Sequence, residues 1–398
     1  MKFKEAISKK MIIIIGLSVS MISCNDLSPT ITDEKGITIA DALGSSYDPP
    51  AKSVKEINED YIIKYIQLET TDESVFRTVM SVIRIDEGIL ITDGESLLLF
   101  DHMGNFIWKV FNKGRGPGEY SGVGDVDVDR WRREIILTCS ETARHFIYDY
   151  NGNLIEEMNL SPAKGFYLTV LDSGTYLLQT GTNKNDPWAW VVTRGGKIIQ
   201  SFTEPNFPQR IYDNGRGSSY IAQRRIGEFK DGYYLWQSDT IWSLDNSLVK
   251  KNVLLTIDPR IVTLEEVVFD PIYQRPINVR GAKDRHYLYE VGTHGKSYLL
   301  LSLFFRKRII LFNPDENALY DYPEGGYTDD IDNGPAFYGL PEYNKPHLSV
   351  IFPFELKKLN PDKFRKGSHL YEIYHGVKAD DNPIIRVLTS KSSEERGN

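Results

Sequence analysis

The strongest constraint on the fold is an internal repeat of β-forming segments separated by short turns. One copy spans residues 88–111, and a second spans residues 134–160. In both copies a strand that ends in an aromatic residue and Asp leads into a Gly-Asn turn, in LLLFDHMGN and HFIYDYNGN. Turns of this composition between apolar runs are typical of β-hairpins. Each copy is therefore predicted to form an antiparallel meander.

Three looser copies of the repeat follow, at residues 174–202, 232–255 and 297–322. A further apolar segment precedes each of the five copies, so each unit is predicted to contain four strands. The units recur about every 40–60 residues, within or near the range for the blades of a β-propeller. The 23 Tyr and 18 Phe residues suit half-buried strands of this kind.

A sixth unit is predicted to combine the two ends of the domain. Pairing the first strand with the last closes the ring and leaves no long free sheet edge. A helical insert is predicted over residues 354–378, with Gly367 between two short helices, because apolar residues recur there at helical spacing: Leu356, Leu359, Phe364, Leu370 and Ile373. The predicted strands of the sixth unit are residues 61–69, 334–340, 347–353 and 383–391. The predicted fold class is therefore all-β, a six-bladed propeller over residues 59–391.

The amino terminus has the features of an export signal. Four Lys residues precede an apolar stretch at residues 11–22, which is shorter than the ~20 residues that cross a bilayer. The stretch ends in Met-Ile-Ser-Cys, which resembles a bacterial lipobox and predicts lipid attachment at Cys24. Plain secretion and a buried amino-terminal helix are the alternatives. Residues 1–23 are thus predicted to be a lipoprotein signal peptide, residues 24–58 a flexible tether, and residues 392–398 a disordered tail.

Charge and cysteine content narrow the possible partners. The formal net charge of the 398 residues is −8, and it becomes −11 once residues 1–23, with four Lys and one Glu, are removed. Such an acidic protein is a poor binder of nucleic acid. If Cys24 is acylated, Cys139 has no intrachain partner, so no disulfide is predicted.

Several stretches together resemble the exported six-bladed β-propeller lipoproteins of Gram-negative bacteria, which are distantly related to NHL-repeat propellers. These stretches are LLLFDHMGNFIWKV, GRGPGEY, DTIWSL, DDIDNGPAF and DDNPIIRVLTSK. The resemblance implies the fold and export. It implies no activity, and the segments NDPWAW and GRGSSY match no pattern of the family.

The glycine-rich segment at residues 114–120, GRGPGEY, matches neither a Walker loop nor a dinucleotide fingerprint, because its glycine spacing differs and a strand follows it. It is interpreted as a turn between the first two blades, with Pro117 at a corner. In NHL-like propellers the equivalent link lies where the central channel opens. Arg115 and Glu119 are therefore candidate ligand contacts in addition to the turn.

Other candidate ligand contacts lie on strands. Asp127 alternates with Val126 and Val128, so its carboxylate is predicted to face away from the valines, either lining the channel or capping a turn with the arginines that follow. Trp188 and Trp190 are predicted to share one face of a strand, where they stack on a sugar ring or pack between blades.

Metal and catalytic motifs are weak. Asp330, Asp332 and Asn333 present oxygens suited to Ca²⁺, but position 341 is Pro and the EF-hand pattern fails, so an acidic turn is the alternative. No His pair has HExxH spacing and no GxSxG motif occurs. No metal or other cofactor is therefore predicted, with Ca²⁺ left as a weak option.

Taken together, these features predict a non-enzymatic binding or scaffold module, anchored by lipid in the cell envelope, at the outer membrane. The expected partners are an envelope protein such as an outer-membrane transporter, or a nutrient such as a glycan or peptide. The alternative is a metal-assisted lyase or hydrolase with its site at the mouth of the channel.

Overall fold

The computed structural model describes the chain from Tyr61 to Lys391 with internal gaps. The described residues are 61–139, 143–161, 163, 167–179, 187–203, 211–213, 218–220, 226–237, 240–256, 267–269, 276–279, 288–294, 298–303, 308–316, 318–322, 326–327, 329, 331–337, 339 and 346–391. Cys24, the predicted signal peptide, the tether and the tail lie outside these residues.

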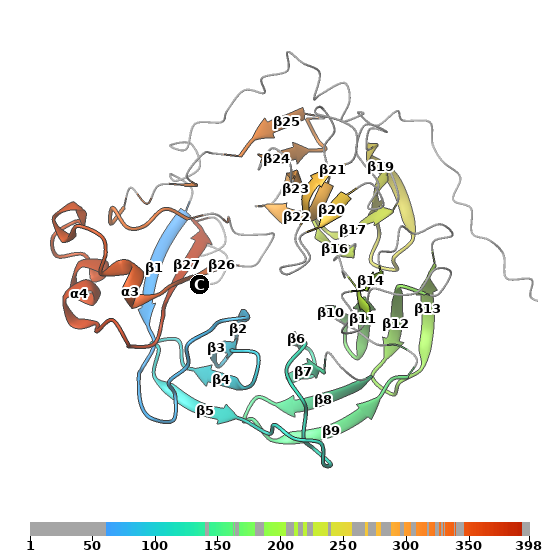
Figure 1. The fold of residues 1–398 in the computed structure, drawn as a ribbon, viewed down its shortest axis with the longest axis horizontal. Helices are drawn as coiled ribbons and strands as arrows, with labels where there is room; N and C mark the ends of the chain where they lie inside the picture. Colours follow the sequence, from blue (N-terminus) through green and yellow to red (C-terminus); the bar gives the residue numbers. More distant parts are fainter. Residues whose placement is uncertain are drawn as a thin grey trace, which may run out of the picture.

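Six sheets are arranged like spokes around a central opening, as in a six-bladed β-propeller (Figure 1). The first two blades contain four antiparallel strands each, in sequence order. Blade 1 comprises β2 (Ser81–Ile85), β3 (Gly88–Thr92), β4 (Leu97–Phe100) and β5 (Phe106–Val110). Blade 2 comprises β6 (Asp125–Asp129), β7 (Glu134–Thr138), β8 (Arg144–Asp149) and β9 (Leu154–Asn159). Both blades match the predicted meanders.

The next three blades have the same order. Blade 3 comprises β10 (Tyr167–Asp172), β11 (Thr175–Gln179), β12 (Ala189–Thr193) and β13 (Ile198–Phe202). Blade 4 comprises β16 (Ile226–Phe229), β17 (Gly232–Gln237), β18 (Thr240–Leu244) and β19 (Lys250–Thr256). Blade 5 comprises β22 (Leu288–His294), β23 (Tyr298–Leu303), β24 (Arg308–Asn313) and β25 (Ala318–Asp321). The five repeats predicted from the sequence are therefore five complete blades.

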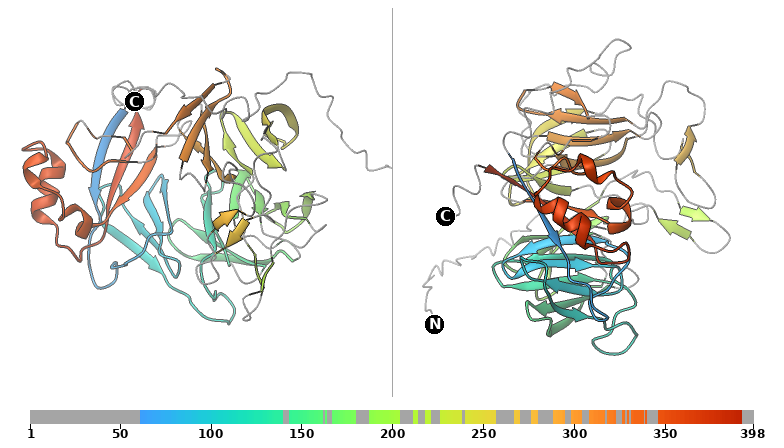
Figure 2. Two further views of the ribbon diagram at one scale, coloured as in Figure 1. Left: turned by 45° about the horizontal axis from the view of Figure 1, so that its top comes forward. Right: turned by 90° about the vertical axis from the view of Figure 1, so that its left-hand side faces the viewer.

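Two short hairpins separate these blades in the sequence. The strands β14 (Ile211–Asp213) and β15 (Ser218–Tyr220) pair with each other, as do β20 (Val267–Phe269) and β21 (Pro276–Val279). Both hairpins project from the same face of the disc (Figure 2).

Blade 6 closes the ring with strands from both ends of the domain. Its sheet order is β1 (Tyr61–Gln67), β27 (Ile384–Ser390) and β26 (His347–Ile351), and β1 runs antiparallel to β27 along its whole length. The predicted closure by the first and last strands is confirmed.

The predicted strand at residues 334–340 is wrong for the residues that the structure describes there. Phe337 makes only an isolated bridge with Tyr327. The reason lies in the carbonyl groups of Pro335 and Ala336, which accept hydrogen bonds from the Arg386 guanidinium, at 2.5 and 3.4 Å. A side chain therefore satisfies backbone groups that a strand partner would otherwise satisfy.

The helical insert has the predicted form. Two short helices, α3 (Pro353–Leu356) and α4 (His369–Gly376), flank the 3₁₀ turn η2 (Pro361–Lys363), and Gly367 lies between them with a φ of +75°. The insert covers the outer side of β1 (Figure 1), where its buried apolar residues pack around Tyr65: Leu356, Phe364, Leu370, Ile373 and Val377. Leu359, predicted to join them, is 38% exposed. The insert thus protects the edge strand at the ring closure.

Apolar layers between neighbouring blades form the core. The strands β3, β4 and β7 are buried at every residue, as expected for sheets that pack on both faces. One cluster joins blades 1 and 2 around Leu99 and Phe146, and another joins blades 2 and 3 around Ile147 and Leu178. Each fully buried side chain of this size contributes about 1.5–3 kcal/mol. No helix in the described part of the chain is long and apolar enough to cross a bilayer.

Candidate functional site

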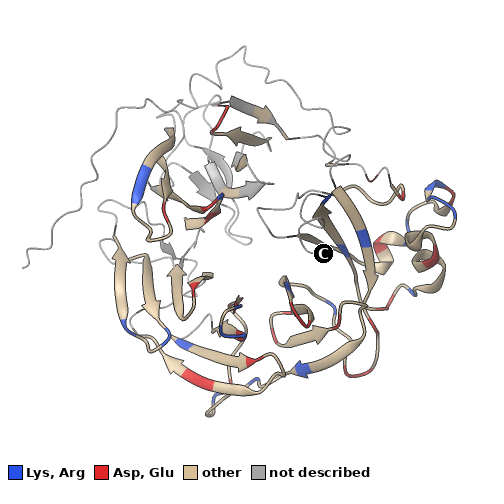
Figure 3. Cartoon of the chain, turned by 180° about the vertical axis from the view of Figure 1, so that it is seen from behind, with Lys and Arg blue, Asp and Glu red and all other residues tan. Residues whose placement is uncertain are grey.

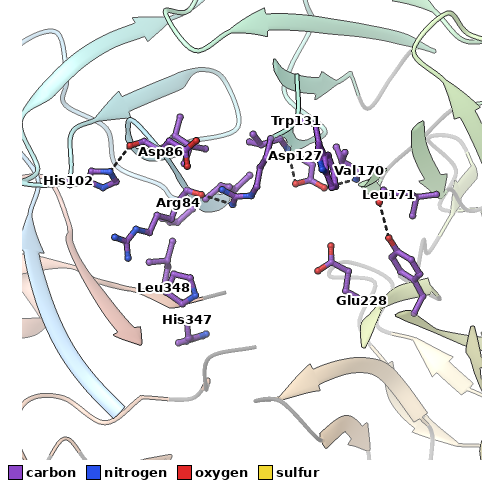
Figure 4. A pocket seen from close by; sticks show the side chains of 17 residues that line it. Arg84, Asp86, His102, Asp127, Trp131, Val170, Leu171, Glu228, His347 and Leu348 are labelled. Carbon is purple, nitrogen blue, oxygen red and sulfur yellow. Dashed lines mark hydrogen bonds between the residues drawn. The ribbon is translucent and has the colours of Figure 1, made fainter. Parts of the chain in front are cut away.

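A cavity of about 850 Å³ lies in the central opening, where the innermost strands of the blades meet. Residues of β2, β6, β10, β16 and β26 line it, together with the turn that joins β6 to β7 (Figure 4). Charged residues of both signs lie on the inner strands around the opening (Figure 3). The ring therefore brings together side chains that are far apart in the sequence, such as Arg84 and His347, which are 263 residues apart.

On one side of the cavity, the aspartates of β6 form a ladder that joins blade 2 to blade 3. One carboxylate oxygen of Asp125 accepts the Leu168 N–H and one of Asp127 accepts the Val170 N–H, each at 2.8 Å. Asp129 accepts the Gly174 N–H at 2.7 Å. The inner strand β10 has an open edge there, so carboxylates take the place of a neighbouring strand.

Asp127 therefore has a structural role in addition to lining the cavity. Its second oxygen accepts the Val128 N–H at 2.8 Å. Its carboxylate faces away from Val126 and Val128, which are buried between blades 1 and 2, and of the two predicted roles it has that of lining the cavity. The carboxylate that caps the following turn belongs to Asp129, which accepts the Arg132 N–H at 3.0 Å.

A second carboxylate, that of Glu228 on β16, projects into the cavity from blade 4 (Figure 4). Tyr233 lies beside it and donates a hydrogen bond to the Leu171 carbonyl oxygen at 3.4 Å. Burial raises the pKa of Tyr233, and the negative charges of Glu228, Asp172 and Asp127 raise it further. This part of the cavity is thus acidic.

The opposite part of the cavity carries two arginines and one carboxylate, that of Asp86. Arg84 on β2 and Arg130, directly after β6, both line the cavity, and the Arg130 guanidinium donates a hydrogen bond to the Arg84 carbonyl oxygen at 2.7 Å. His347 on β26 lies below Arg84 in Figure 4. Burial, with a smaller effect of the Arg386 charge, lowers the pKa of His347 to about 4, so its ring is neutral at neutral pH.

An exposed tryptophan stands at the rim. Trp131, in the turn between β6 and β7, lines the cavity yet remains 65% exposed. Arg133 in the same turn has a φ of +56°, a left-handed conformation that is uncommon for residues other than glycine. A large exposed aromatic ring beside a cavity is more informative than a scattered surface leucine, because aromatic rings often anchor ligands.

Arg115 and Glu119 do not reach this cavity. Their loop crosses from β5 to β6, and the Glu119 carboxylate folds back to accept the Gly116 N–H at 2.8 Å. The tip packs on the outer part of blade 2, where Gly118 N–H donates to Glu157 at 2.8 Å. The turn interpretation accounts for these contacts, and neither residue is among those that line the cavity.

The predicted tryptophan pair is not an exposed pair. Trp188 and Trp190 are 2% and 5% exposed, and they lie in different interblade clusters, Trp188 between blades 3 and 4 and Trp190 between blades 2 and 3. Because β12 begins only at Ala189, strict alternation does not extend back to Trp188. The prediction that the two rings share one face is therefore wrong, and interblade packing is their observed environment.

In the acidic turn, the carboxylate that accepts the hydrogen bonds belongs to Asp329, one residue before the predicted residues 330, 332 and 333. Asp329 is fully buried and accepts the N–H groups of Ile331, Asp332 and Gly334 at 3.0–3.1 Å, as well as the Tyr65 hydroxyl. Asp330 lies outside the described residues, Asp332 is half-buried and Asn333 is exposed. Across the described part of the chain, no three His, Cys, Asp or Glu side chains form a group that could hold a metal ion.

Sequence reasoning missed Arg84, Glu228, His347 and Trp131. The available signal was position: the first strand of every predicted blade is the one that lines a propeller channel, so any charged residue on it was a candidate. Only Asp127 was selected in this way.

The chain matches one family model and is similar to several solved structures. A family model described as a domain of unknown function, DUF4934, matches residues 49–389. A crystal structure of a presumed exported protein from Bacteroides fragilis superposes with a TM-score of 0.61 and 18% identity, over 84% of this chain and 96% of that chain. A DUF4221 family member from Bacteroides vulgatus gives a TM-score of 0.44 and 9% identity, over 84% and 99% of the two chains. Virginiamycin B lyase from Staphylococcus aureus gives 0.37 and 12%, over 83% and 99%. The search of curated proteins finds no match.

Proposed function

The chain belongs to the DUF4934 family, whose model spans residues 49–389, and we propose that it is a ligand-binding module of the cell envelope. The observation that carries the proposal is the central cavity of about 850 Å³, with charged groups of both signs and an exposed tryptophan at its rim. Pockets that bind small molecules are typically concave, apolar in part and supplied with a few convergent polar groups. The propeller fold itself specifies no function, so the proposal rests on this site.

Binding is the function that the described cavity supports, because charged, polar and aromatic side chains converge in it. The cavity is lined by two arginines, three carboxylates, two histidines and a tryptophan, and these groups suit polar recognition. The metal-assisted lyase or hydrolase considered from the sequence has no comparable observation in its favour.

A ligand screen with a matched pair of variants tests this function. The soluble protein without its signal peptide is screened by thermal shift against amino acids, short peptides and oligosaccharides. We expect at least one class to raise the unfolding midpoint, and Trp131→Ala to weaken binding of that ligand about 5- to 20-fold, because the ring contacts the ligand at the rim.

The control is Phe111→Ala, which removes another exposed aromatic ring, on the loop after β5 and outside the cavity. This variant should bind the ligand as the parent protein does. If no class binds, or if Trp131→Ala binds as tightly as the parent protein, the cavity is not a ligand site.

The proposed location is the outer membrane, with the propeller held there through lipid on Cys24 and the tether over residues 24–58. Several acyl chains, each contributing about 0.8 kcal/mol per buried CH₂ group, suffice for stable anchoring without a membrane-spanning helix. Growth of the expressing bacterium with a clickable palmitate analogue should label the protein, and Cys24→Ala should abolish the label. Labelling that persists in Cys24→Ala, or parent protein that stays unlabelled, would remove the anchor from the proposal.

A further inference from the structure

The charges around the cavity are partly separated by sign. One carboxylate, that of Asp86, lines the cavity on the side of Arg84, and it lies 3.6 Å from the Arg133 guanidinium, which offsets its charge. Asp127 and Glu228 lie on β6 and β16, on either side of β10, whereas Arg84 lies on β2, across the cavity from Glu228 (Figure 4). Arg130 lies beside Arg84, to whose carbonyl oxygen it donates a hydrogen bond. With Asp86 offset by Arg133, the cavity has an acidic side at Asp127 and Glu228 and a net basic side at Arg84 and Arg130.

This separation disfavours ligands with charge of a single sign. An anion attracted to Arg84 meets the negative charge of Glu228 across the same cavity, and a cation meets the reverse arrangement. Charge-assisted hydrogen bonds are about twice as strong as neutral ones. A ligand that carries both charges, one at each end, makes such bonds on both sides.

The walls between the charged sides are apolar and suit side chains. Val82 and Ile83 of β2, Leu171 of β10 and Leu348 of β26 line the cavity, and the Trp131 ring stands at the mouth. The volume of about 850 Å³ lies within the range of drug-sized ligand sites, which corresponds to a few amino-acid residues rather than a folded partner.

We propose that the cavity binds a short peptide with both ends free, its ammonium group facing Glu228 and Asp127 and its carboxylate facing Arg84 and Arg130. The inference rests on the proposed function of the cavity as a ligand site, and it names the class of ligand. His347 is neutral at neutral pH and acts only as a hydrogen-bonding group in this arrangement. Apolar side chains of the peptide pack on Leu171, Leu348 and Trp131.

The first test needs no variant. A pool of tripeptides randomised at all three positions is offered to the soluble protein in four forms, namely with free ends, N-acetylated, C-amidated and blocked at both ends. Binding is measured by native mass spectrometry and confirmed by calorimetry on the tightest members. Each block should weaken binding at least about tenfold, because it removes one charge-assisted interaction. Equal binding of the free and doubly blocked pools would overturn the proposal.

Two variants then assign the ends. Glu228→Gln should bind peptides with free and acetylated amino ends about equally. It should keep its preference for a free carboxyl end. Arg84→Gln should do the reverse. The matched controls Glu355→Gln and Arg77→Gln change exposed residues outside the cavity, and they should keep both preferences.

The outcomes separate this proposal from the function on which it rests. If oligosaccharides bind in a Trp131-dependent manner and no peptide pool does, the peptide proposal fails and the ligand-site function stands. If neither class binds, both fail. If both end preferences survive in Glu228→Gln and Arg84→Gln, with thermal midpoints like that of the parent protein, the charged sides do not read the ends of the peptide and the proposal is overturned.

Discussion

Replacing Asp329 with alanine is expected to lower the free energy of unfolding by about 3–5 kcal/mol. The carboxylate is fully buried and accepts three backbone N–H groups and the Tyr65 hydroxyl. In Asp329→Ala these donors lose their acceptor, and each buried donor left without a partner costs about 1–3 kcal/mol. Solvent that enters the site recovers part of this cost.

Two neighbours of Asp329, namely Arg386 on β27 and Gly334 in the same turn, add to the expected loss of stability. Arg386 on β27 is 3% exposed, and burial lowers the pKa of its guanidinium while Tyr65 and Asp329 oppose that shift. Loss of Asp329 leaves this cation with less compensation. At Gly334 the packing is so close that a Cβ atom would lie 2.6 Å from the Asp329 carboxylate and 2.3 Å from the Tyr65 hydroxyl oxygen. The turn is therefore built around the carboxylate.

The control for this prediction is Asp332→Ala in the same turn. Burial and the nearby charge of Asp329 raise the pKa of Asp332, so the charged form of this side chain is disfavoured in its environment. Its removal should change the free energy of unfolding by less than about 0.5 kcal/mol, or increase it. Urea unfolding followed by tryptophan fluorescence measures both variants. A loss below about 1 kcal/mol in Asp329→Ala would show that the turn does not depend on this carboxylate.

The fold was predictable because the turns between its strands are stabilised by hydrogen bonds between residues that are close in sequence. In the first blade Asp101 accepts the N–H groups of Met103 and Asn105, each at 2.8 Å, and in the second blade Asp149 does the same for Asn151 and Asn153 at 2.9 and 2.8 Å. These bonds join residues two and four positions apart, so the sequence displays the turn directly. Strand period and turn chemistry therefore agree in these two blades.

The site was harder to predict because its determinants are distant in sequence. The alternation of Asp and Val in β6 was visible, but the N–H groups that the carboxylates accept belong to β10, about 43 residues later. Arg84 and Glu228 are isolated charges within strands, and only closure of the ring brings them to one cavity. The environment of Trp188 and Trp190 was equally hard to predict. Neighbouring blades bury both rings, and no local sequence pattern reveals those blades.

Closure of the ring by β1 has the largest expected effect. Seven residues of β1 pair with β27, from Tyr61 with Ser390 to Gln67 with Ile384. Tyr65 is 3% exposed and packs against the helical insert, while Ile63 and Ile66 are half-buried against two further clusters. A chain that begins at Leu68 loses all of these contacts and exposes one edge of β27.

We expect this truncated chain to lose at least about 4 kcal/mol of unfolding free energy relative to a chain that begins at Tyr61, because one fully buried and four half-buried apolar side chains are removed. It should also form oligomers through the open edge, detected by size-exclusion chromatography with light scattering. A synthetic peptide of residues 61–67 should restore the monomer by strand addition, and a scrambled peptide should not. The same peptide with Tyr65→Phe should restore it less well, since its ring packs but donates no hydrogen bond to Asp329. A truncated chain that stays monomeric and as stable as its control would mean that the remaining blades hold the ring without the strand from the other end.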